Sequence, residues 1–252
     1  MRLQNKVALV TGAGAGIGQA IAETFAKEGA KVVVNDMNPS SGQSVAEAIN
    51  KEGGTAAFVQ ADVSKEADVV RMVQFTVETY GRLDILVNNA GIELIKPTHE
   101  LTEQDWDRVM NVNLKGCFLV SKHGVVQMMT NGGGSIVNMS SAAGLMGFPL
   151  LASYCATKGG VVQLTRTMAL EYRAANIRVN AICPALIKTE LGDRFVESYK
   201  AAGIPADELL MSMQGRMGTV QDVAGTALFL ASEDASFVNG VTLPVDGGAC
   251  AG

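Results

Sequence analysis

The sequence has few of the side chains that hold catalytic metal ions. It contains only two histidines, His99 and His123, and its four cysteines lie far apart and form no CxxC pair. Zinc and related metals need such ligands at short, regular spacing, so we expect no metal site. The cysteine pattern indicates reduced, buried thiols, as in a cytoplasmic protein. Cys155 lies about 100° around an expected helix from its neighbour Tyr154, and we interpret it as a packing residue.

The sequence also lacks a basic excess and any long apolar run. Its formal net charge is −5, whereas nucleic-acid-binding proteins carry an excess of lysine and arginine. No apolar run approaches the ~20 residues that are needed to span a bilayer. Residues 2–6, Arg-Leu-Gln-Asn-Lys, do not read as a signal peptide. We therefore expect a cytoplasmic protein that has neither nucleic acid nor membrane as a partner.

Short apolar runs and helical patterns alternate along the chain. With 48% hydrophobic and 18% charged residues over 252 positions, the chain can bury a sizeable core. Alternation of strand and helix is typical of a parallel sheet with helices on both faces. Because no repeat or linker interrupts the pattern, residues 1–252 are expected to form one domain. The expected strands cover residues 6–10, 31–35, 56–60, 84–87, 135–139, 177–182 and 240–245, and the longer helical patterns cover 40–52, 66–80, 101–130 and 219–231.

A glycine-rich loop, TGAGAGIG at residues 11–18, joins the first expected strand to a helical pattern. Glycines permit positive φ angles and let a phosphate approach the backbone, and a helix N-terminus supplies free N–H groups. The glycines alternate, at Gly12, Gly14, Gly16 and Gly18, which is not the common GxGxxG spacing. Between a strand and a helix, the loop nevertheless predicts a phosphate-binding site.

Asp36 ends the second expected strand, 18 residues beyond Gly18. An acid about 20 residues after the glycine loop binds the adenosine ribose in dinucleotide-binding folds. A carboxylate accepts hydrogen bonds from ribose hydroxyls and repels a 2′-phosphate, so Asp36 favours NAD over NADP. Ala15 agrees, because a basic side chain in the loop would suit the additional phosphate. The alternative is an aspartate that only begins the turn Met37-Asn38-Pro39.

Polar residues follow two further strands at their carboxyl ends, where open parallel sheets bind ligands. Asn88-Asn89-Ala90-Gly91 follows the fourth expected strand, and Ser140-Ser141 follows the fifth. Asn88 can have a purely structural role in holding its turn. Asn113 lies within the long helical stretch, where asparagine is unfavourable. It therefore either bonds a neighbouring carbonyl group or marks a functional kink.

Tyr154 and Lys158 are four residues apart at the start of a helical pattern, so they share one helix face. A tyrosine has a pKa near ~10, and lowering it by ~3 units takes roughly 4 kcal/mol, which a close cation in a partly dry pocket can supply. Such a tyrosine could exchange a proton with an alcohol or a carbonyl group. The alternative is a packed ring beside a solvated amine.

The segment 190–217 is rich in apolar residues but has no clean period, so we expect an irregular lid or wall over a pocket. Together with apolar residues near the strand ends, it suggests an apolar pocket for a cyclic, aliphatic or steroid-like substrate. The same side chains could equally belong to the core or to an interface. They are Leu94, Ile95, Leu145, Met146, Phe148 and Leu150, with Leu191, Phe195, Ile204, Leu209, Leu210, Met211 and Met213 in the segment.

Taken together, these motifs resemble those of the short-chain dehydrogenase/reductase family, and the resemblance covers essentially the whole chain. Residues 11–18 match its TGxxxGIG loop, residues 88–91 its NNAG motif, and Tyr154 with Lys158 its YxxxK motif. Ser141, thirteen residues before Tyr154, fits the family's catalytic serine better than Ser140, and Asn113 matches its helix asparagine. Cys183-Pro184-Ala185 departs from the family's frequent Pro-Gly, but this change removes no functional group.

The resemblance implies a Rossmann-type, doubly wound parallel sheet of about seven strands in the order 3-2-1-4-5-6-7. It also implies a homotetramer and a catalytic set of Asn113, Ser141, Tyr154 and Lys158. In this mechanism, Tyr154 exchanges the proton of the substrate oxygen, Ser141 bonds that oxygen, and Lys158 holds the pKa of Tyr154 down. Asn113 would hold a water that connects Lys158 to solvent. The implied NAD-binding residues are Gly12, Gly16, Ile17, Gly18, Asp36, Asp62, Val63, Asn89, Gly91, Tyr154, Lys158, Ile187 and Thr189.

Three functions fit the sequence. The first is an NAD-dependent oxidoreductase that acts on a secondary alcohol or ketone. The second is an NADPH-dependent 3-oxoacyl carrier-protein reductase, against which Asp36 and Ala15 speak. The third is a non-catalytic, nucleotide-binding regulatory protein. In such a protein we would expect the catalytic positions to be eroded, whereas Ser141, Tyr154, Lys158 and Asn113 are all present.

Overall fold

Seven parallel strands form one sheet in the order β3-β2-β1-β4-β5-β6-β7, which confirms the expected fold. The computed structural model describes residues 1–251, without the side chains of Asp207, Leu209 and Leu210. The order reverses direction between β1 and β4, and this switch point is where open sheets bind ligands. The strands are β1 Val7–Thr11, β2 Lys31–Asp36, β3 Thr55–Gln60, β4 Ile85–Asn88, β5 Gly134–Met139, β6 Ile177–Pro184 and β7 Thr242–Val245.

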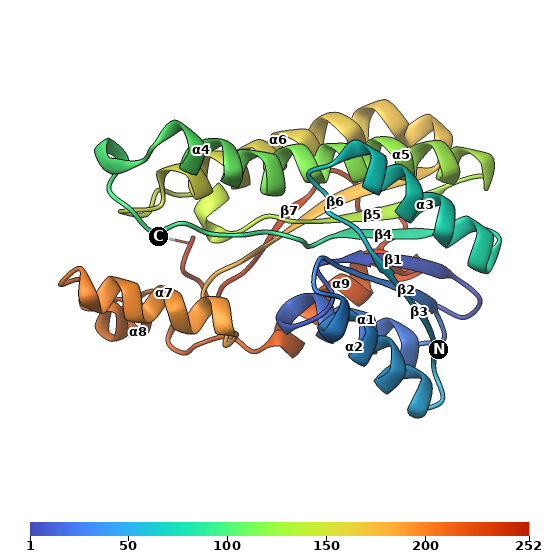
Figure 1. The fold of residues 1–252 in the computed structure, drawn as a ribbon, viewed down its shortest axis with the longest axis horizontal. Helices are drawn as coiled ribbons and strands as arrows, with labels where there is room; N and C mark the ends of the chain where they lie inside the picture. Colours follow the sequence, from blue (N-terminus) through green and yellow to red (C-terminus); the bar gives the residue numbers. More distant parts are fainter. Residues whose placement is uncertain (252) are drawn as a thin grey trace.

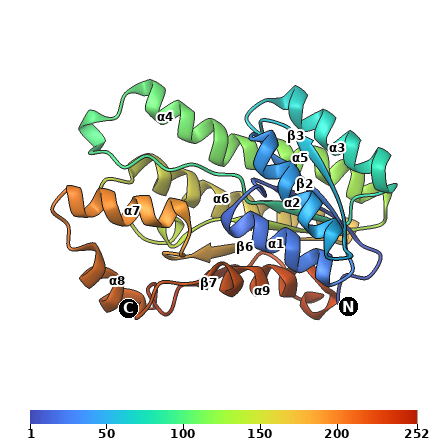
Figure 2. The ribbon, with the colours of Figure 1, turned by 60° about the horizontal axis from the view of Figure 1, so that its bottom comes forward.

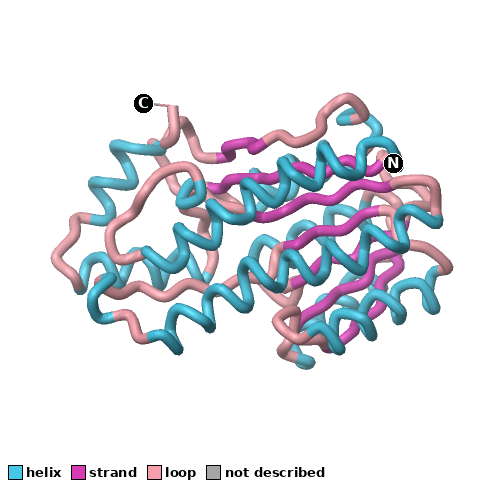
Figure 3. The backbone as a smooth tube through the Cα atoms, turned by 90° about the horizontal axis from the view of Figure 1, so that it is seen from above, coloured by secondary structure: helices cyan, strands magenta, loops and turns pink. Residues whose placement is uncertain are grey.

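Helices cover both faces of the sheet, as Figures 1 and 3 show. Helices α1, α2 and α9 lie on one face, and α3, α5 and α6 lie on the other. Helices α7 and α8 lie beyond the carboxyl ends of the strands (Figure 2). The helices are α1 Gly16–Lys27, α2 Pro39–Lys51, α3 Glu66–Tyr80, α4 Glu103–Met110, α5 Gly116–Thr130, α6 Ala152–Tyr172, α7 Glu190–Ala201, α8 Ala206–Gln214 and α9 Val220–Ala231.

The central strands are buried on both faces, which explains their continuous apolar sequences. All five residues of β1 are buried. Ala8 and Val10 pack into the core beneath α1, α2 and α9, whereas Leu9 packs into the core beneath α3, α5 and α6. Burying one such large side chain contributes about 1.5–3 kcal/mol. Packing on both faces therefore fixes the positions of the strand ends at the carboxyl edge of the sheet. Among the described helices, none is both long and apolar enough to cross a bilayer.

Two segments differ from the sequence expectation. The stretch 101–130 is not one regular helix, because a π-helical turn, Asn111–Lys115, separates α4 from α5. The expectation that residues 190–217 are irregular is wrong, since they form α7 and α8. The Thr189 side chain accepts a hydrogen bond from Gly192 N and so begins α7, and the Gly203-Ile204-Pro205 link separates the helices. The predicted pocket side chains Leu209 and Leu210 lie outside the described residues.

Candidate active site

A groove with a volume of about 440 Å³ runs along the carboxyl edge of the sheet. It brings together residues from the glycine loop, the ends of β2, β4 and β5, and helix α6. Three expected site residues do not line it, namely Gly18, Asp62 and Asn113. The expected residues that line the groove are Gly12, Gly16, Ile17, Asp36, Val63, Asn89, Gly91, Ser141, Tyr154, Lys158, Ile187 and Thr189.

The glycine loop needs its glycines for different reasons. Gly12 and Gly16 have φ angles of 61° and 58°, a region that side chains disfavour. A Cβ atom on Gly16 would also lie 3.4 Å from Cγ2 of Thr189, across the groove. Gly18 instead lies inside α1, where a Cβ atom would collide with the carbonyl oxygen of Gly12. Gly18 therefore acts through packing, and it brings the helix N-terminus close to the loop.

Asp36 lines the groove, but its carboxylate also organises the backbone. Its Oδ2 accepts a hydrogen bond from Gly14 N at 2.9 Å, and its Oδ1 accepts one from Asn38 N at 2.9 Å. The second bond is the turn contact of the alternative interpretation. A carboxylate has about four acceptor sites, so these two bonds leave acceptor capacity for ribose hydroxyls. Both interpretations of Asp36 are therefore compatible with the structure.

Asn89 fastens the glycine loop to the end of β4. Its Nδ2 donates to the carbonyl oxygens of Thr11 and Gly12 at 2.9 and 3.0 Å. The Thr11 hydroxyl accepts from the backbone N–H groups of Asn89 and Ala90. Sequence reasoning missed this role of Thr11, although Thr11 begins the glycine motif. Asn88 is structural, as one interpretation held, because its Nδ2 donates to Ser121 and Asn138 within the core.

Asn113 and Asp62 lie behind the groove lining and hold its backbone. The Asn113 side chain is buried in the π-helical turn and forms two 2.8 Å hydrogen bonds with the backbone of Ile92. Its Nδ2 also donates to the Thr157 hydroxyl on α6. Asn113 therefore both bonds a neighbouring carbonyl and marks a helix irregularity. The Asp62 carboxylate accepts from the backbone N–H and the hydroxyl of Ser64 and thereby shapes the loop before α3.

Tyr154 and Lys158 lie on one face of α6, as their spacing predicts. The Lys158 Nζ lies 5.4 Å from the centre of the Tyr154 ring and donates to the Met139 carbonyl oxygen at 2.7 Å. Lys158 is only 4% exposed, and this burial lowers the pKa of its ammonium to about 8. The structure therefore excludes the alternative of a solvated amine.

The electrostatic surroundings of the Tyr154 hydroxyl bear on the role expected of Lys158. Burial raises the pKa of the Tyr154 hydroxyl, the charge of Glu93 raises it further, and the Ser141 hydroxyl partly opposes both effects. Lys158 was expected to lower this pKa. This effect stays a prediction, and the structure shows only that the Lys158 ammonium is buried and donates to the Met139 carbonyl oxygen. A further positive charge at the site would favour the phenolate form of Tyr154.

Ser140 and Ser141 both line the groove, but their hydroxyls are held differently. The Ser140 hydroxyl is buried and donates to the Lys158 carbonyl oxygen at 2.9 Å, so it ties β5 to α6. The Ser141 hydroxyl accepts from Ala143 N at 3.1 Å and lies at the edge of the groove. The catalytic role of Ser141 stays a prediction.

A second, mostly apolar pocket with a volume of about 100 Å³ opens beside Tyr154 and Ser141, which line both cavities. Among the apolar residues expected here, Phe148, Leu191, Phe195 and Met213 line it, whereas Leu94, Ile95, Leu145, Met146, Leu150, Ile204 and Met211 do not. Sequence reasoning missed Glu93, which also lines the pocket. Glu93 lies two residues after the NNAG motif, and this position is the feature of the sequence that could have identified it as a pocket residue.

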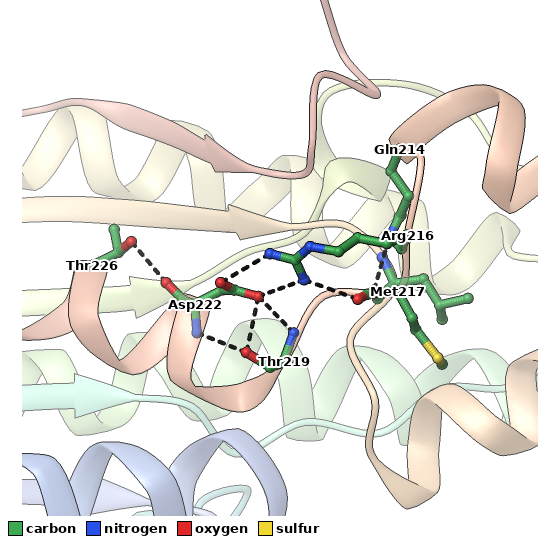
Figure 4. A network of polar contacts seen from close by, with 7 residues as sticks. Gln214, Arg216, Met217, Thr219, Asp222 and Thr226 are labelled. Carbon is green, nitrogen blue, oxygen red and sulfur yellow. Dashed lines mark hydrogen bonds and ion pairs between the residues drawn. The ribbon is translucent and has the colours of Figure 1, made fainter.

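A polar network fixes the junction between α8 and α9, where one wall of the pocket ends (Figure 4). The Arg216 guanidinium forms two hydrogen bonds with the Asp222 carboxylate, at 2.9 and 3.1 Å. Asp222 also accepts from the backbone N–H and hydroxyl of Thr219, the N-cap residue of α9, and so completes a capping box. Arg216 holds the pKa of Asp222 well below its usual range. The network therefore anchors the segment that carries α8.

The groove fits a dinucleotide. A carboxylate stands at the end of β2, a glycine cradle precedes the N-terminus of α1, and a lysine and a tyrosine stand beside the apolar pocket. These are the features of a Rossmann-type oxidoreductase that uses a nicotinamide cofactor.

The chain belongs to the short-chain dehydrogenase/reductase family. Residues 12–250 match the family model described as enoyl-(acyl carrier protein) reductase. Curated relatives include an uncharacterized oxidoreductase of Thermotoga maritima. It is 44% identical, and the match covers 100% of this chain and 100% of the relative. A 3-oxoacyl-[acyl-carrier-protein] reductase of the same organism is 41% identical over 98% of this chain and 99% of the relative.

Solved structures agree with this assignment. A levodione reductase superposes with a TM-score of 0.95 at 36% identity, covering 99% of each chain. A gluconate 5-dehydrogenase from Burkholderia cenocepacia, in complex with NADP and tartrate, gives a TM-score of 0.93 at 37% identity. It is matched over 100% of this chain and 97% of its own. The chain is therefore an oxidoreductase that acts on hydroxyl or ketone groups with a nicotinamide cofactor.

Proposed function

We propose that the protein is an NAD(H)-dependent oxidoreductase that transfers a hydride between the nicotinamide and a secondary alcohol or ketone with an apolar body. One observation carries this proposal. Ser141 and Tyr154 line both the cofactor groove and the apolar pocket. A substrate oxygen held by these two hydroxyls places its carbon at the point where the two cavities meet. The apolar walls then receive the remainder of the substrate.

The catalytic roles follow from this placement. A nicotinamide held in the groove would supply the acceptor for the hydride of the alcohol carbon. Tyr154 takes the alcohol proton as the carbonyl group forms, and it returns the proton in the reverse direction. Ser141 bonds the substrate oxygen and stabilises its developing charge. Lys158 supplies a cation near the Tyr154 ring. Asn113, whose side chain bonds the backbone of Ile92, would hold a water that connects Lys158 to solvent.

The remaining groove residues would hold the dinucleotide. Gly12, Gly16, Ile17 and the N-terminus of α1 would bind the pyrophosphate, with Gly18 as the packing residue that allows their approach. Asp36 would accept hydrogen bonds from the adenosine ribose, which favours NAD, although one similar structure contains NADP. The other proposed contacts are Asp62 and Val63 around the adenine, Asn89 and Gly91 beside the adenosine ribose, and Ile187 and Thr189 toward the carboxamide and pyrophosphate.

A second candidate is an NADPH-dependent 3-oxoacyl-[acyl-carrier-protein] reductase, which the relative of that name favours. A spectrophotometric screen of secondary alcohols, ketones and a 3-oxoacyl thioester, each with NAD(H) and NADP(H), tests both candidates. We expect turnover of apolar secondary alcohols with NAD. Turnover restricted to the thioester with NADPH would establish the second candidate. A cofactor-binding titration with no turnover of any probe would indicate a non-catalytic nucleotide-binding protein.

We further propose that residues 1–252 act as one cytoplasmic domain in which residues 190–217 serve as the substrate lid. Leu191 and Phe195 of α7 and Met213 of α8 line the apolar pocket, which supports this role. Exposed apolar residues on α5 and α6 support a homotetramer.

A further inference from the structure

Glu93 is the one acidic side chain among the described residues that line the substrate pocket, and no basic side chain lines it. It lies in the loop after β4, two residues beyond Gly91 of the groove. Its carboxylate has no hydrogen bond and no ion pair within the described part of the chain. A carboxylate in mostly apolar surroundings normally has such partners, because its desolvation is costly.

The surroundings of Glu93 compensate for the burial of its carboxylate only in part. Burial raises the pKa of Glu93 to about 7, and the positive charge of Arg194 opposes the effect only in part. The Arg194 guanidinium instead bonds Glu190 at 2.9 Å, one turn away on α7. The lone pairs of Glu93 are therefore available to a group that enters the pocket.

The other polar side chains near the pocket are already engaged. The Gln214 amide donates to the carbonyl oxygens of Leu186 and Arg216 and accepts from Leu186 N. The Tyr199 hydroxyl, close enough for the charge of Glu93 to raise its pKa, donates to the Pro149 carbonyl oxygen at 2.6 Å. Beyond the proposed catalytic hydroxyls of Ser141 and Tyr154, Glu93 is thus the polar side chain with free bonding capacity in the described pocket lining.

We propose that Glu93 is a specificity-determining residue that accepts a hydrogen bond from a second hydroxyl group of the substrate. This inference rests on the proposed function and narrows its substrate class to neutral diols and hydroxy ketones with an apolar body. An anionic substrate is disfavoured, because Glu93 repels it and no described basic residue in the pocket attracts it.

The test compares probes that differ by one hydroxyl group. Initial rates are measured for cyclohexanol, for the 1,2-, 1,3- and 1,4-cyclohexanediols, and for their monomethyl ethers, which retain the second oxygen but lose its O–H donor. We expect kcat/KM for at least one diol to exceed that for cyclohexanol by about tenfold or more, mainly through KM, because a site built for a hydroxyl rejects analogues that lack it. The corresponding ether should be no better than cyclohexanol.

Substitutions of Glu93 test whether this residue causes the preference for a diol over cyclohexanol. Glu93→Leu should lose the diol preference while it still oxidises cyclohexanol, and Glu93→Gln, which retains an acceptor oxygen, should keep part of it. Glu197→Gln removes an exposed charge from α7 and should leave the preference unchanged. An equal diol preference in the wild type and both Glu93 variants, or no preference in the wild type, would overturn the inference while cyclohexanol turnover still supports the proposed function. No turnover of any alcohol with either cofactor would overturn both.

Discussion

At the scale of single residues, spacing located the reactive pair but did not describe its electrostatics. The four-residue separation of Tyr154 and Lys158 correctly placed both on one face of α6. The pKa values could not be predicted in this way, because burial and Glu93 raise the pKa of Tyr154 and burial lowers that of Lys158. These effects come from residues that are distant in the sequence. A positive charge that arrives with the oxidised cofactor would supply the missing stabilisation of a phenolate.

Replacing Tyr154 by phenylalanine removes the hydroxyl and leaves the ring. We expect kcat to fall by about 10²–10⁴-fold, the usual contribution of a general acid–base group. The dinucleotide dissociation constant should change little, because the groove walls remain. Stopped-flow turnover and a fluorescence titration with NADH measure the two quantities. Tyr172→Phe, at the other end of α6, serves as the control, and a Tyr154→Phe enzyme with full turnover would contradict the proposed role.

Asp36 accepts two structural hydrogen bonds, one on each carboxylate oxygen, so the mildest substitution removes its charge but keeps one acceptor oxygen. Asp36→Asn keeps an oxygen for a backbone N–H but no longer repels a 2′-phosphate. We expect the ratio of kcat/KM for NAD to that for NADP to fall by about tenfold, or roughly 1.4 kcal/mol. Asp36→Ala should lower this ratio and also weaken both cofactors, because Gly14 N loses its acceptor. An unchanged ratio in Asp36→Asn would mean that the residue only holds the turn.

Glu93 also makes stability depend on pH. Its pKa rises from 4.5 to about 7 on folding, so the folded protein binds more protons than the unfolded chain within this window. Stability is therefore lost as the pH rises from about 4.5 to 7. Glu93→Gln should remove this loss, which makes the variant more stable than the wild type by about 1–3 kcal/mol at pH 8 but not at pH 4.5. Urea unfolding at both pH values measures the difference. If Glu93→Gln changed the free energy of unfolding equally at pH 4.5 and pH 8, Glu93 would not be an ionised, desolvated group.

At the scale of elements, the sequence identified the strands and the glycine loop because their signals are local. Continuous apolar runs such as residues 7–11 leave few alternatives to a buried parallel strand. The π-helical turn at residues 111–115 could not be predicted, because it depends on hydrogen bonds between Asn113 and Ile92, on another segment. Helices α7 and α8 were missed for a different reason. They are two short helices separated by the Gly203-Ile204-Pro205 link, so no single helical period runs through residues 190–217.

The junction between α8 and α9 gives a prediction at this scale. Arg216→Gln removes the paired hydrogen bonds to Asp222 but leaves Asp222 in the capping box of α9. Exposed ion pairs contribute little to stability, so we expect the rate of proteolytic cleavage within residues 203–218 to rise only about two- to fivefold. We also expect the substrate KM to rise by a larger factor than that by which kcat falls. Arg71→Gln breaks a comparable exposed pair on α3, far from the pocket, and should change neither value. Equal cleavage of Arg216→Gln and the wild type would show that packing alone holds α8.

At the scale of the whole molecule, the two cores leave one helical layer with unpaired apolar side chains. Phe118, Val126 and Met129 share one face of α5 and are 47%, 51% and 47% exposed, and Leu170 of α6 is 66% exposed. Large exposed apolar groups on adjacent helices are typical of protein–protein interfaces. We expect this layer to be covered by further copies of the chain in a homotetramer. Sedimentation should then give four times the chain mass of 26.3 kDa.

Charged substitutions on this layer test the tetramer. Val126→Asp together with Met129→Asp would bury two unpaired carboxylates in the interface, so the protein should sediment as a smaller species. Ser44→Asp adds a charge to an exposed position on α2, in the opposite layer, and should leave the tetramer intact. A wild type that sediments at 26.3 kDa would exclude the tetramer, and a double variant that still sediments at four times this mass would place the interface elsewhere. Because the substrate pocket lies at the carboxyl edge of the sheet and not on this layer, cofactor binding by the dissociated variant should persist.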